Sequence, residues 1–318
     1  MHSFLMFIIG FILLLAGGEY LVKAAVSLAL KLKLSRIVIG MTVVSFATSV
    51  PELIVSITSA LRGHPDLAMS NVIGSNIANI GLVLGFTALL IPIRVKRQTY
   101  RYNWPAMMLF SFLFYIFLIN DERLSRIEGL ILFVLLIVFT IFIIRQSYIS
   151  GDAALDEFDE KLNRTRAWRV MLWLLIGGAA LWLGSRLLVD GAVELARIFG
   201  VSERLIGISL VAVGTSIPEL AASMISAFKQ EKDISLGNLI GSNIFNIGSV
   251  IGVTALIKPI NHFAGKLIAV DIYWMLFISF LIVPLSLLPP KNSISRWKGA
   301  LFLMFYGIFI YIAFFNRQ

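Results

Sequence analysis

The 318-residue chain contains no cysteine and little charge. Without cysteine it can form neither a disulfide nor a thiolate metal site, and it has no cysteine nucleophile. Only 14% of the residues are charged, whereas 58% are hydrophobic. This is far more apolar than a soluble domain of similar length, so the composition indicates an integral membrane protein. The three histidines, His2, His64 and His262, lie at a terminus or in predicted loops.

What the chain does contain is a series of long apolar runs. A helix needs about 20 apolar residues to span a bilayer core, and the short alternating strands of a β-barrel are not seen. We therefore predict an all-α polytopic membrane protein with ten transmembrane helices. The runs are 3–26, 37–61, 67–93, 103–120, 126–145, 168–190, 204–228, 234–257, 268–288 and 297–314. We interpret the first run as a helix of the mature protein, because it lacks the basic segment that begins a signal peptide.

The two halves of the chain repeat each other. A shift of 167 residues aligns Ile39–Ile93 with Ile206–Ile260 without a gap, and 28 of these 55 positions are identical. Five helices per half is an odd number, so the second half is expected to enter the membrane from the opposite side. Inverted repeats of this kind are typical of secondary transporters, with the substrate site near the membrane midplane. The predicted organisation is a first five-helix repeat (1–145), a short cytoplasmic linker (146–167) and a second five-helix repeat (168–318).

The net charge of +9 is explained by the loops between the apolar runs. Of the 27 lysines and arginines, 17 fall in the five loops on one side and 8 on the other, with two within helix ends. Cytoplasmic loops carry such an excess. The charge therefore predicts both termini outside the cytoplasm and gives no reason to expect a nucleic-acid partner.

Each repeat places one carboxylate inside an apolar run. Glu52 lies in "ATSVPEL" (Ala47–Leu53) and Glu219 in "GTSIPEL" (Gly214–Leu220). A charged side chain at the centre of a membrane helix costs roughly 2.5–3.5 kcal/mol on insertion scales, and no lysine or arginine is predicted at mid-span to pair with either acid. Two unpaired acids at matched positions indicate a cation site.

Other oxygen-bearing side chains share the helix face of each acid at spacings of three and four residues. In the first copy these are Ser45, Ser49 and Ser56, and in the second Ser216 and Ser223, with Ala212 in place of Ser45. The next helix of each repeat carries a matching row at intervals of four. These rows are Asn71, Ser75 and Asn79 in the first copy, and Asn238, Ser242 and Asn246 in the second.

A proline precedes each acid. Pro51 and Pro218 have no amide hydrogen, so the carbonyl four residues earlier loses its helical partner. We expect a helix break at both prolines and backbone oxygens near Thr48 and Thr215 that turn away from the helix axis. In a membrane, such carbonyls persist only where a cavity or a cation satisfies them.

The predicted ligands are therefore two carboxylates, hydroxyls, amide oxygens and backbone carbonyls. Hard oxygen ligands of this kind favour Ca²⁺ or Na⁺ over zinc or copper, and a flexible set of six to eight suits Ca²⁺. One Ca²⁺ neutralises the two acids, and Na⁺ could use the same oxygens only after Ca²⁺ leaves, because positive charge accumulates at high cost in a low dielectric. Mutually exclusive occupancy is the minimum requirement for an antiporter.

The segments "GMTVVSFATSVPEL", "NVIGSNIANIG", "GISLVAVGTSIPEL" and "NLIGSNIFNIG" resemble the two α-repeats of the calcium/cation antiporter superfamily, in particular its prokaryotic sodium/calcium exchanger branch. The resemblance covers essentially the whole chain. It implies a multi-pass protein of the cytoplasmic (inner) membrane of a prokaryote, with both termini periplasmic. It also implies electrogenic exchange of Ca²⁺ for Na⁺ by alternating access, with the bilayer as surroundings, a monomer as the functional unit and no cofactor.

The resemblance also implies roles for individual residues. Glu52 and Glu219 would bind Ca²⁺ together with the backbone carbonyls of Thr48 and Thr215. The flanking sodium sites would use Ser45, Ser49, Glu52, Ser75, Ala212, Ser216, Glu219 and Ser242. Asn79 and Asn246 would occupy the remaining central position. Relatives often have an aspartate at one of these two positions, and its absence here argues against coupling to K⁺.

Two other transport functions remain open from the residues. Protonation of a glutamate could replace sodium, which would give an H⁺-coupled cation antiporter. An oxygen-lined site could also belong to a cation channel. An intramembrane enzyme is not expected, because no predicted span holds the histidine or cysteine of a nucleophile–base pair or of a catalytic metal site.

Overall fold

The computed structural model describes residues 2–121, 123–150, 162, 164–199, 214–261 and 270–315. The described chain is nearly all helical, and its four strands have two residues each. The first half contains α1 (His2–Leu32), α2 (Arg36–Ile39), η1 (Gly40–Val44), α3 (Ser45–Leu61), α4 (Pro65–Ala78), η2 (Asn79–Leu84), α5 (Gly85–Leu90), β1 (Ile93–Arg94), η3 (Thr99–Asn103), α6 (Trp104–Asp121), β2 (Arg123–Leu124) and α7 (Arg126–Ser150), where η marks a π-helical segment.

The second half repeats much of this order. It contains α9 (Ala167–Ile198), α12 (Ile217–Phe228), α13 (Lys232–Phe245), η5 (Asn246–Ile251), α14 (Gly252–Ile257), β3 (Ile260–Asn261), α15 (Ile272–Phe280), α16 (Ile282–Leu287), β4 (Ser293–Ile294) and α17 (Arg296–Phe315). Within the described ranges, eight helices are long and apolar enough to cross a membrane. The expected runs 204–228 and 268–288 contain shorter apolar helices, at Ile217–Phe228 and Ile272–Leu287.

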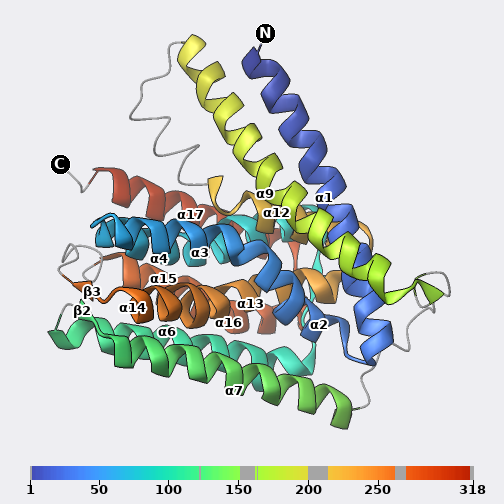
Figure 1. The fold of residues 1–318 in the computed structure, drawn as a ribbon. Coiled ribbons are helices and arrows are strands. Elements are labelled where there is room, and N and C mark those ends of the chain that lie inside the picture. Colours follow the sequence, from blue (N-terminus) through green and yellow to red (C-terminus); the bar gives the residue numbers. More distant parts are fainter. Residues whose placement is uncertain are drawn as a thin grey trace.

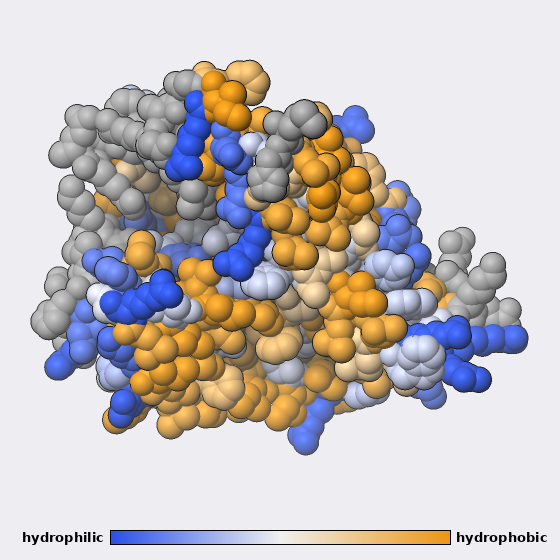
Figure 2. Space-filling model, turned by 45° about the horizontal axis from the view of Figure 1, so that its top comes forward, coloured by the Kyte–Doolittle hydropathy of each residue, from blue (hydrophilic) through white to orange (hydrophobic). Residues whose placement is uncertain are grey.

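The surface of the molecule is largely apolar. Figure 2 shows hydrophobic side chains over most of one face, with many of the hydrophilic ones gathered toward its ends. Several isoleucine, leucine and valine side chains along α7, from Ile127 to Ile141, are exposed, whereas Leu132 and Leu136 face the interior. By contrast, 78% of the apolar windows within Pro65–Leu90 and Lys232–Ile257 is buried. These two segments therefore form the centre of the bundle, and α7 is one of the helices that face lipid.

Helices α1 and α9 lie side by side and cross the remaining helices at an angle (Figure 1). Glycines allow their backbones to touch. A Cβ atom at Gly10 would lie 2.4 Å from the amide nitrogen of Leu188, and one at Gly17 would lie 2.8 Å from that of Leu181. The later residue of α1 meets the earlier residue of α9, so the two helices are antiparallel. Small residues permit such close packing in membranes, where no hydrophobic force drives helices together.

The other contacts between the halves also come in pairs. Strand β1 pairs with β4 and strand β2 with β3, each antiparallel. Backbone contacts through glycine link Gly85 of α5 to Gly299 of α17, and Gly129 of α7 to Gly252 of α14. Positions 85 and 252 are 167 residues apart, as are the starts of β1 and β3. Each half therefore completes its packing with elements of the other half.

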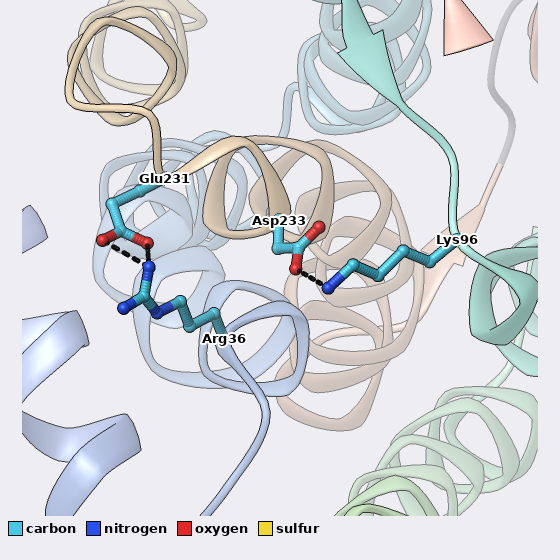
Figure 3. A network of polar contacts seen from close by, with 4 residues as sticks. All are labelled: Arg36, Lys96, Glu231 and Asp233. Carbon is cyan, nitrogen blue, oxygen red and sulfur yellow. Dashed lines mark hydrogen bonds and ion pairs between the residues drawn. The ribbon is translucent and has the colours of Figure 1, made fainter. Parts of the chain in front are cut away.

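Two ion pairs fasten the halves together at one end of the bundle (Figure 3). Arg36, at the start of α2, places one guanidinium nitrogen 2.7 Å from each carboxylate oxygen of Glu231. Lys96, which follows β1, lies 2.6 Å from Asp233 at the start of α13. Burial raises the pKa of the Glu231 carboxyl above its ordinary value, and Arg36 beside it offsets part of that rise.

Lys298 is buried in the first turn of α17. Its ammonium group donates hydrogen bonds to the backbone carbonyls of Leu288 at 2.8 Å, Pro290 at 2.7 Å and Ser293 at 2.7 Å. The three carbonyls thus satisfy the charge of the ammonium group, and these hydrogen bonds hold the segment between α16 and α17 in place.

We predict that Gly10→Ala destabilises the protein by about 1–3 kcal/mol, because the added methyl group forces the backbones of α1 and α9 apart. The measurement is the thermal unfolding midpoint of the detergent-solubilised protein. The matched control is Gly307→Ala in α17, where no described atom other than the neighbouring backbone of α17 itself lies within 4 Å of the new Cβ. The control should be neutral or stabilising by up to roughly 1 kcal/mol, since alanine is the better helix former. An equal loss in both variants would contradict the packing argument.

We predict that Arg36→Gln lowers the free energy of unfolding by about 1–3 kcal/mol at pH 8 and by less at pH 4. A buried carboxyl with a raised folded-state pKa makes the folded protein less stable as the pH rises through that pKa. Without Arg36 this loss of protein stability is larger. At pH 4, below the ordinary pKa of 4.5, Glu231 is protonated and needs no cation beside it. Chemical denaturation at both pH values measures the difference. The exposed Arg62→Gln control should show no such pH dependence.

Candidate cation site

The residues expected to form the site lie at the centre of the bundle. Helix α3 carries four of them and α12, with the turn before it, carries three. These are Ser45, Thr48, Ser49 and Glu52, and Thr215, Ser216 and Glu219. Ser75 lies on α4, Ser242 on α13, and Asn79 and Asn246 are the first residues of η2 and η5. Both glutamates are only 1% exposed. Thr215 is half-buried, and the others are buried. Ala212 falls outside the described residues.

Eight oxygen atoms of these side chains are buried without a hydrogen-bond partner among the described residues. They are both carboxylate oxygens of Glu52 and of Glu219, the hydroxyl oxygens of Ser49 and Ser216, and the amide oxygens of Asn79 and Asn246. Each atom has a counterpart 167 residues away in the other half. Buried polar atoms are normally paired, so this symmetric set of oxygens is the candidate site at which a bound cation would complete the coordination.

The site is assembled from both halves. Helix α3 packs against α13 and η5, and α12 packs against η2. The hydroxyl oxygens of Thr48 and Ser242 lie 3.4 Å apart, and those of Thr215 and Ser75 lie 3.3 Å apart. The two acid-bearing helices, α3 and α12, also contact each other. The chain fold thus brings both acids, both threonine–serine pairs and both central asparagines into one region.

Some of the expected oxygens are used for packing. The hydroxyl group of Ser45 contacts the backbone carbonyls of Gly40 and Asn238, each at 2.9 Å. Asn71 donates its amide hydrogen to Ser56 at 3.0 Å, and the corresponding pair in the second half has a distance of 3.1 Å. These contacts tie each acid-bearing helix to its neighbour, so the side chains concerned act as braces.

The two prolines differ in their effect on the helix. Pro218 lies in the first turn of α12, after the turn formed by Thr215 and Ser216. Pro51 lies inside α3 and does not end it, which corrects the expected break at that position. A single proline removes one backbone hydrogen bond, and neighbouring turns can hold the helix together around it. Next to Pro218, the carbonyl of Gly214 accepts a hydrogen bond of 2.9 Å from Ser185 of α9.

Sequence reasoning missed two features. Asn76 and Asn243 form hydrogen bonds across the halves and hold the amide nitrogens of Asn246 and Asn79 at 3.0 and 3.1 Å. Their duplication within "GSN" was a usable signal, but they lie off the face selected by the four-residue spacing. The π-helical segments η2 and η5, which begin at Asn79 and Asn246, had no recognisable signal. Such segments occur often at functional sites.

The donor set determines what the site can bind. No group of three or more His, Cys, Asp or Glu residues gathers in the described part of the chain, so all donors beyond the two carboxylates are neutral oxygens. Two negative charges with neutral oxygen ligands suit hard cations such as Ca²⁺ or Na⁺. The arrangement offers no nucleophile beside a base, and therefore suits binding and release of a cation rather than covalent chemistry.

A separate cavity of about 620 Å³ lies between α3 and α9. Its lining is almost entirely apolar and includes Phe46, Ile54, Leu174 and Trp182. None of the eight unpartnered oxygens belongs to a residue that lines it. This cavity is therefore distinct from the cation site.

Comparison with known proteins gives consistent matches along the chain. The model of the family described as "Sodium/calcium exchanger protein" matches residues 2–145 and 169–315. The protein CaxA of Alkalimonas amylolytica is 40% identical over 312 residues, which cover 96% of this chain and 97% of CaxA. The inner membrane protein YrbG of Escherichia coli (strain K12) is 40% identical over 257 residues, 79% of each chain. A solved structure of the sodium-calcium exchanger NCX_Mj, soaked with 10 mM Na⁺ and without Ca²⁺, has a TM-score of 0.80 at 32% identity and covers 96% of this chain and 97% of its own.

Proposed function

Because the chain belongs to the sodium/calcium exchanger protein family, we propose that it is a secondary active antiporter that exchanges Ca²⁺ for Na⁺ across a membrane. The observation that carries this proposal is the set of eight buried, unpartnered oxygens contributed equally by the two halves. A buried carboxylate without a partner is costly in a low dielectric. A transported cation would remove that cost for both acids at once.

In this proposal Glu52 and Glu219 bind Ca²⁺ together with the backbone carbonyls of Thr48 and Thr215. The flanking sodium sites use the two glutamates, the hydroxyls of the serines on the four central helices, and backbone near positions 45 and 212. Those serines are Ser49, Ser75, Ser216 and Ser242. Asn79 and Asn246 supply neutral oxygens at the centre, so the charge of the site stays at −2 in the absence of protons.

Charge balance supports the coupling. One Ca²⁺ neutralises the two acids, and simultaneous Na⁺ would leave uncompensated positive charge inside the protein. We propose that the two ions occupy the site in turn by alternating access. We further propose that the exchange is electrogenic, with more sodium charge moving one way than calcium charge moves the other.

The proposed architecture is ten transmembrane helices in two inverted five-helix repeats, 1–145 and 168–318, joined by a cytoplasmic linker. The paired strand and glycine contacts between the halves support it. The excess of basic residues in one set of loops supports periplasmic termini, and the name of the relative YrbG supports the inner membrane. Since one chain supplies both halves of the site, we propose that a monomer is sufficient for transport.

We predict that Glu219→Gln abolishes Ca²⁺ exchange while the protein still folds and inserts. The amide keeps the size of the side chain but removes one of the two charges that a divalent cation requires. The measurement is ⁴⁵Ca²⁺ uptake into proteoliposomes under an imposed Na⁺ gradient, with gel filtration to verify folding. The control is Glu194→Gln, an exposed acid on α9, which should transport normally. Exchange by Glu219→Gln at a near-native rate would refute the site assignment.

We predict that Ca²⁺ uptake depends on an outward Na⁺ gradient and saturates with Ca²⁺ concentration. Parallel vesicles with Na⁺, Li⁺, K⁺ or H⁺ gradients identify the counter-ion. Uptake with an H⁺ gradient alone would favour a proton-coupled antiporter. Steady, non-saturating conductance in either direction would instead favour a channel.

A further inference from the structure

Asn76 of α4 and Asn243 of α13 lock the two halves together at the centre of the bundle. The side-chain nitrogen of Asn76 donates to the backbone carbonyl of Asn243 at 3.4 Å, and that of Asn243 donates to the carbonyl of Asn76 at 3.1 Å. Both residues are at most 1% exposed. The reciprocal pair joins two helices that come from different halves of the chain.

This pair determines how the remaining atoms must be oriented. A backbone carbonyl can only accept, so the NH₂ group of Asn243 has to face it. The amide oxygen of Asn243 then accepts from the side-chain nitrogen of Asn79, at 3.1 Å. In turn, the oxygen of Asn79 has to point away from Asn243, and this oxygen is buried without a partner. The orientation of Asn79 thus follows from an unambiguous acceptor, the carbonyl of Asn76.

The same chain of contacts runs in the opposite direction. The nitrogen of Asn76 faces the carbonyl of Asn243, and the oxygen of Asn76 accepts from the nitrogen of Asn246 at 3.0 Å. The oxygen of Asn246 is therefore turned away as well, and it too is buried without a partner. The segment that begins at Asn246 packs against α3, which carries Glu52, and the segment that begins at Asn79 packs against α12, which carries Glu219.

We propose that Asn76 and Asn243 are positioning residues that keep the amide oxygens of Asn246 and Asn79 turned toward the transported cation. This inference rests on the proposed function and extends it, because each half of the chain would orient a ligand that belongs to the other half. An unrestrained asparagine can rotate and present its NH₂ group, which repels a cation. Groups that orient metal ligands typically affect metal affinity by about 10–100-fold when they are removed.

A side-chain pair that only held the two helices together would need fewer hydrogen bonds. The reciprocal bonds between Asn76 and Asn243 already join the two helices, and the additional bonds to Asn246 and Asn79 also fix which atom of each of these two amides faces away. The additional bonds are explained by orientation of the two unpartnered oxygens. These bonds also define which residue orients which ligand: Asn76 orients Asn246, and Asn243 orients Asn79.

The test is equilibrium binding of ⁴⁵Ca²⁺ to the purified full-length protein in Na⁺-free buffer, which does not require turnover. Asn76→Leu should raise the Ca²⁺ concentration for half-saturation about ten-fold or more. The matched control is Asn103→Leu, since Asn103 is also fully buried and its amide has no partner among the described residues. The control should bind Ca²⁺ like the native protein.

Double variants provide a sharper test, because each positioning residue should depend on only one of the two amide ligands. Asn76→Leu should add little to the effect of Asn246→Ala, because the oriented oxygen is already gone, and should keep its full effect in an Asn79→Ala background. Asn243→Leu should show the reverse pattern. Equal effects in both backgrounds, or no effect of Asn76→Leu alone, would overturn the positioning role. If Asn246→Ala and Asn79→Ala both bind Ca²⁺ normally, the role of these two amides as ligands fails, which overturns the positioning role but is separate from failure of the glutamate site tested by Glu219→Gln.

A second variant addresses the case in which Asn76→Leu does not fold, as judged by gel filtration. Asn76→Asp keeps an oxygen that accepts from Asn246 but loses the amide donor to the backbone carbonyl of Asn243. If orientation matters, this variant should bind Ca²⁺ within a few-fold of the native protein. A loss of ten-fold or more would indicate a structural brace and contradict the proposal.

Discussion

The structure depends on the burial of two carboxylates, Glu52 and Glu219, at the centre of a membrane protein. Among the described residues, neither carboxylate has a basic partner, and neither forms a hydrogen bond of ordinary length and angle through its oxygens. Desolvation of such groups costs several kcal/mol each, and their mutual repulsion adds to that cost. The fold therefore has to supply rigid surroundings that hold both acids in place. It also has to leave room for a positive charge that can arrive and leave.

Rigidity comes from contacts between backbones. Glycines let α1 lie directly on α9, and they let the central helices meet α7 and α17 at equally short range. Such contacts exclude lipid and water along the bundle without large side chains. At the ends of the helices, two-residue strands and the Arg36–Glu231 pair join the halves. The polar centre is thus enclosed by closely packed helices whose contacts involve few polar side chains.

The symmetry of the site has a chemical consequence. Each unpartnered oxygen of one half has a counterpart in the other, so a cation bound at the centre would meet the same donors from both sides. The asparagine pair that crosses between the halves links the orientation of each central amide to the position of the opposite helix. A movement of one half relative to the other would therefore alter ligands on both. This connects the arrangement of the halves to the affinity of the site.

The sequence by itself determined the class of protein and the internal repeat, and it predicted most of the candidate site, because an acid within an apolar run is visible without coordinates. Glu52, Glu219, Asn79 and Asn246 were found from duplicated spacing alone. The tertiary structure decided what depends on distant contacts. It showed that the hydroxyl of Ser45 is used for packing, that α3 continues through Pro51, and that η2 and η5 begin at the central asparagines. It also revealed Asn76 and Asn243, whose partners lie more than 160 residues away. Helical periodicity describes one face of one helix, and these hydrogen bonds exist only where two helices cross.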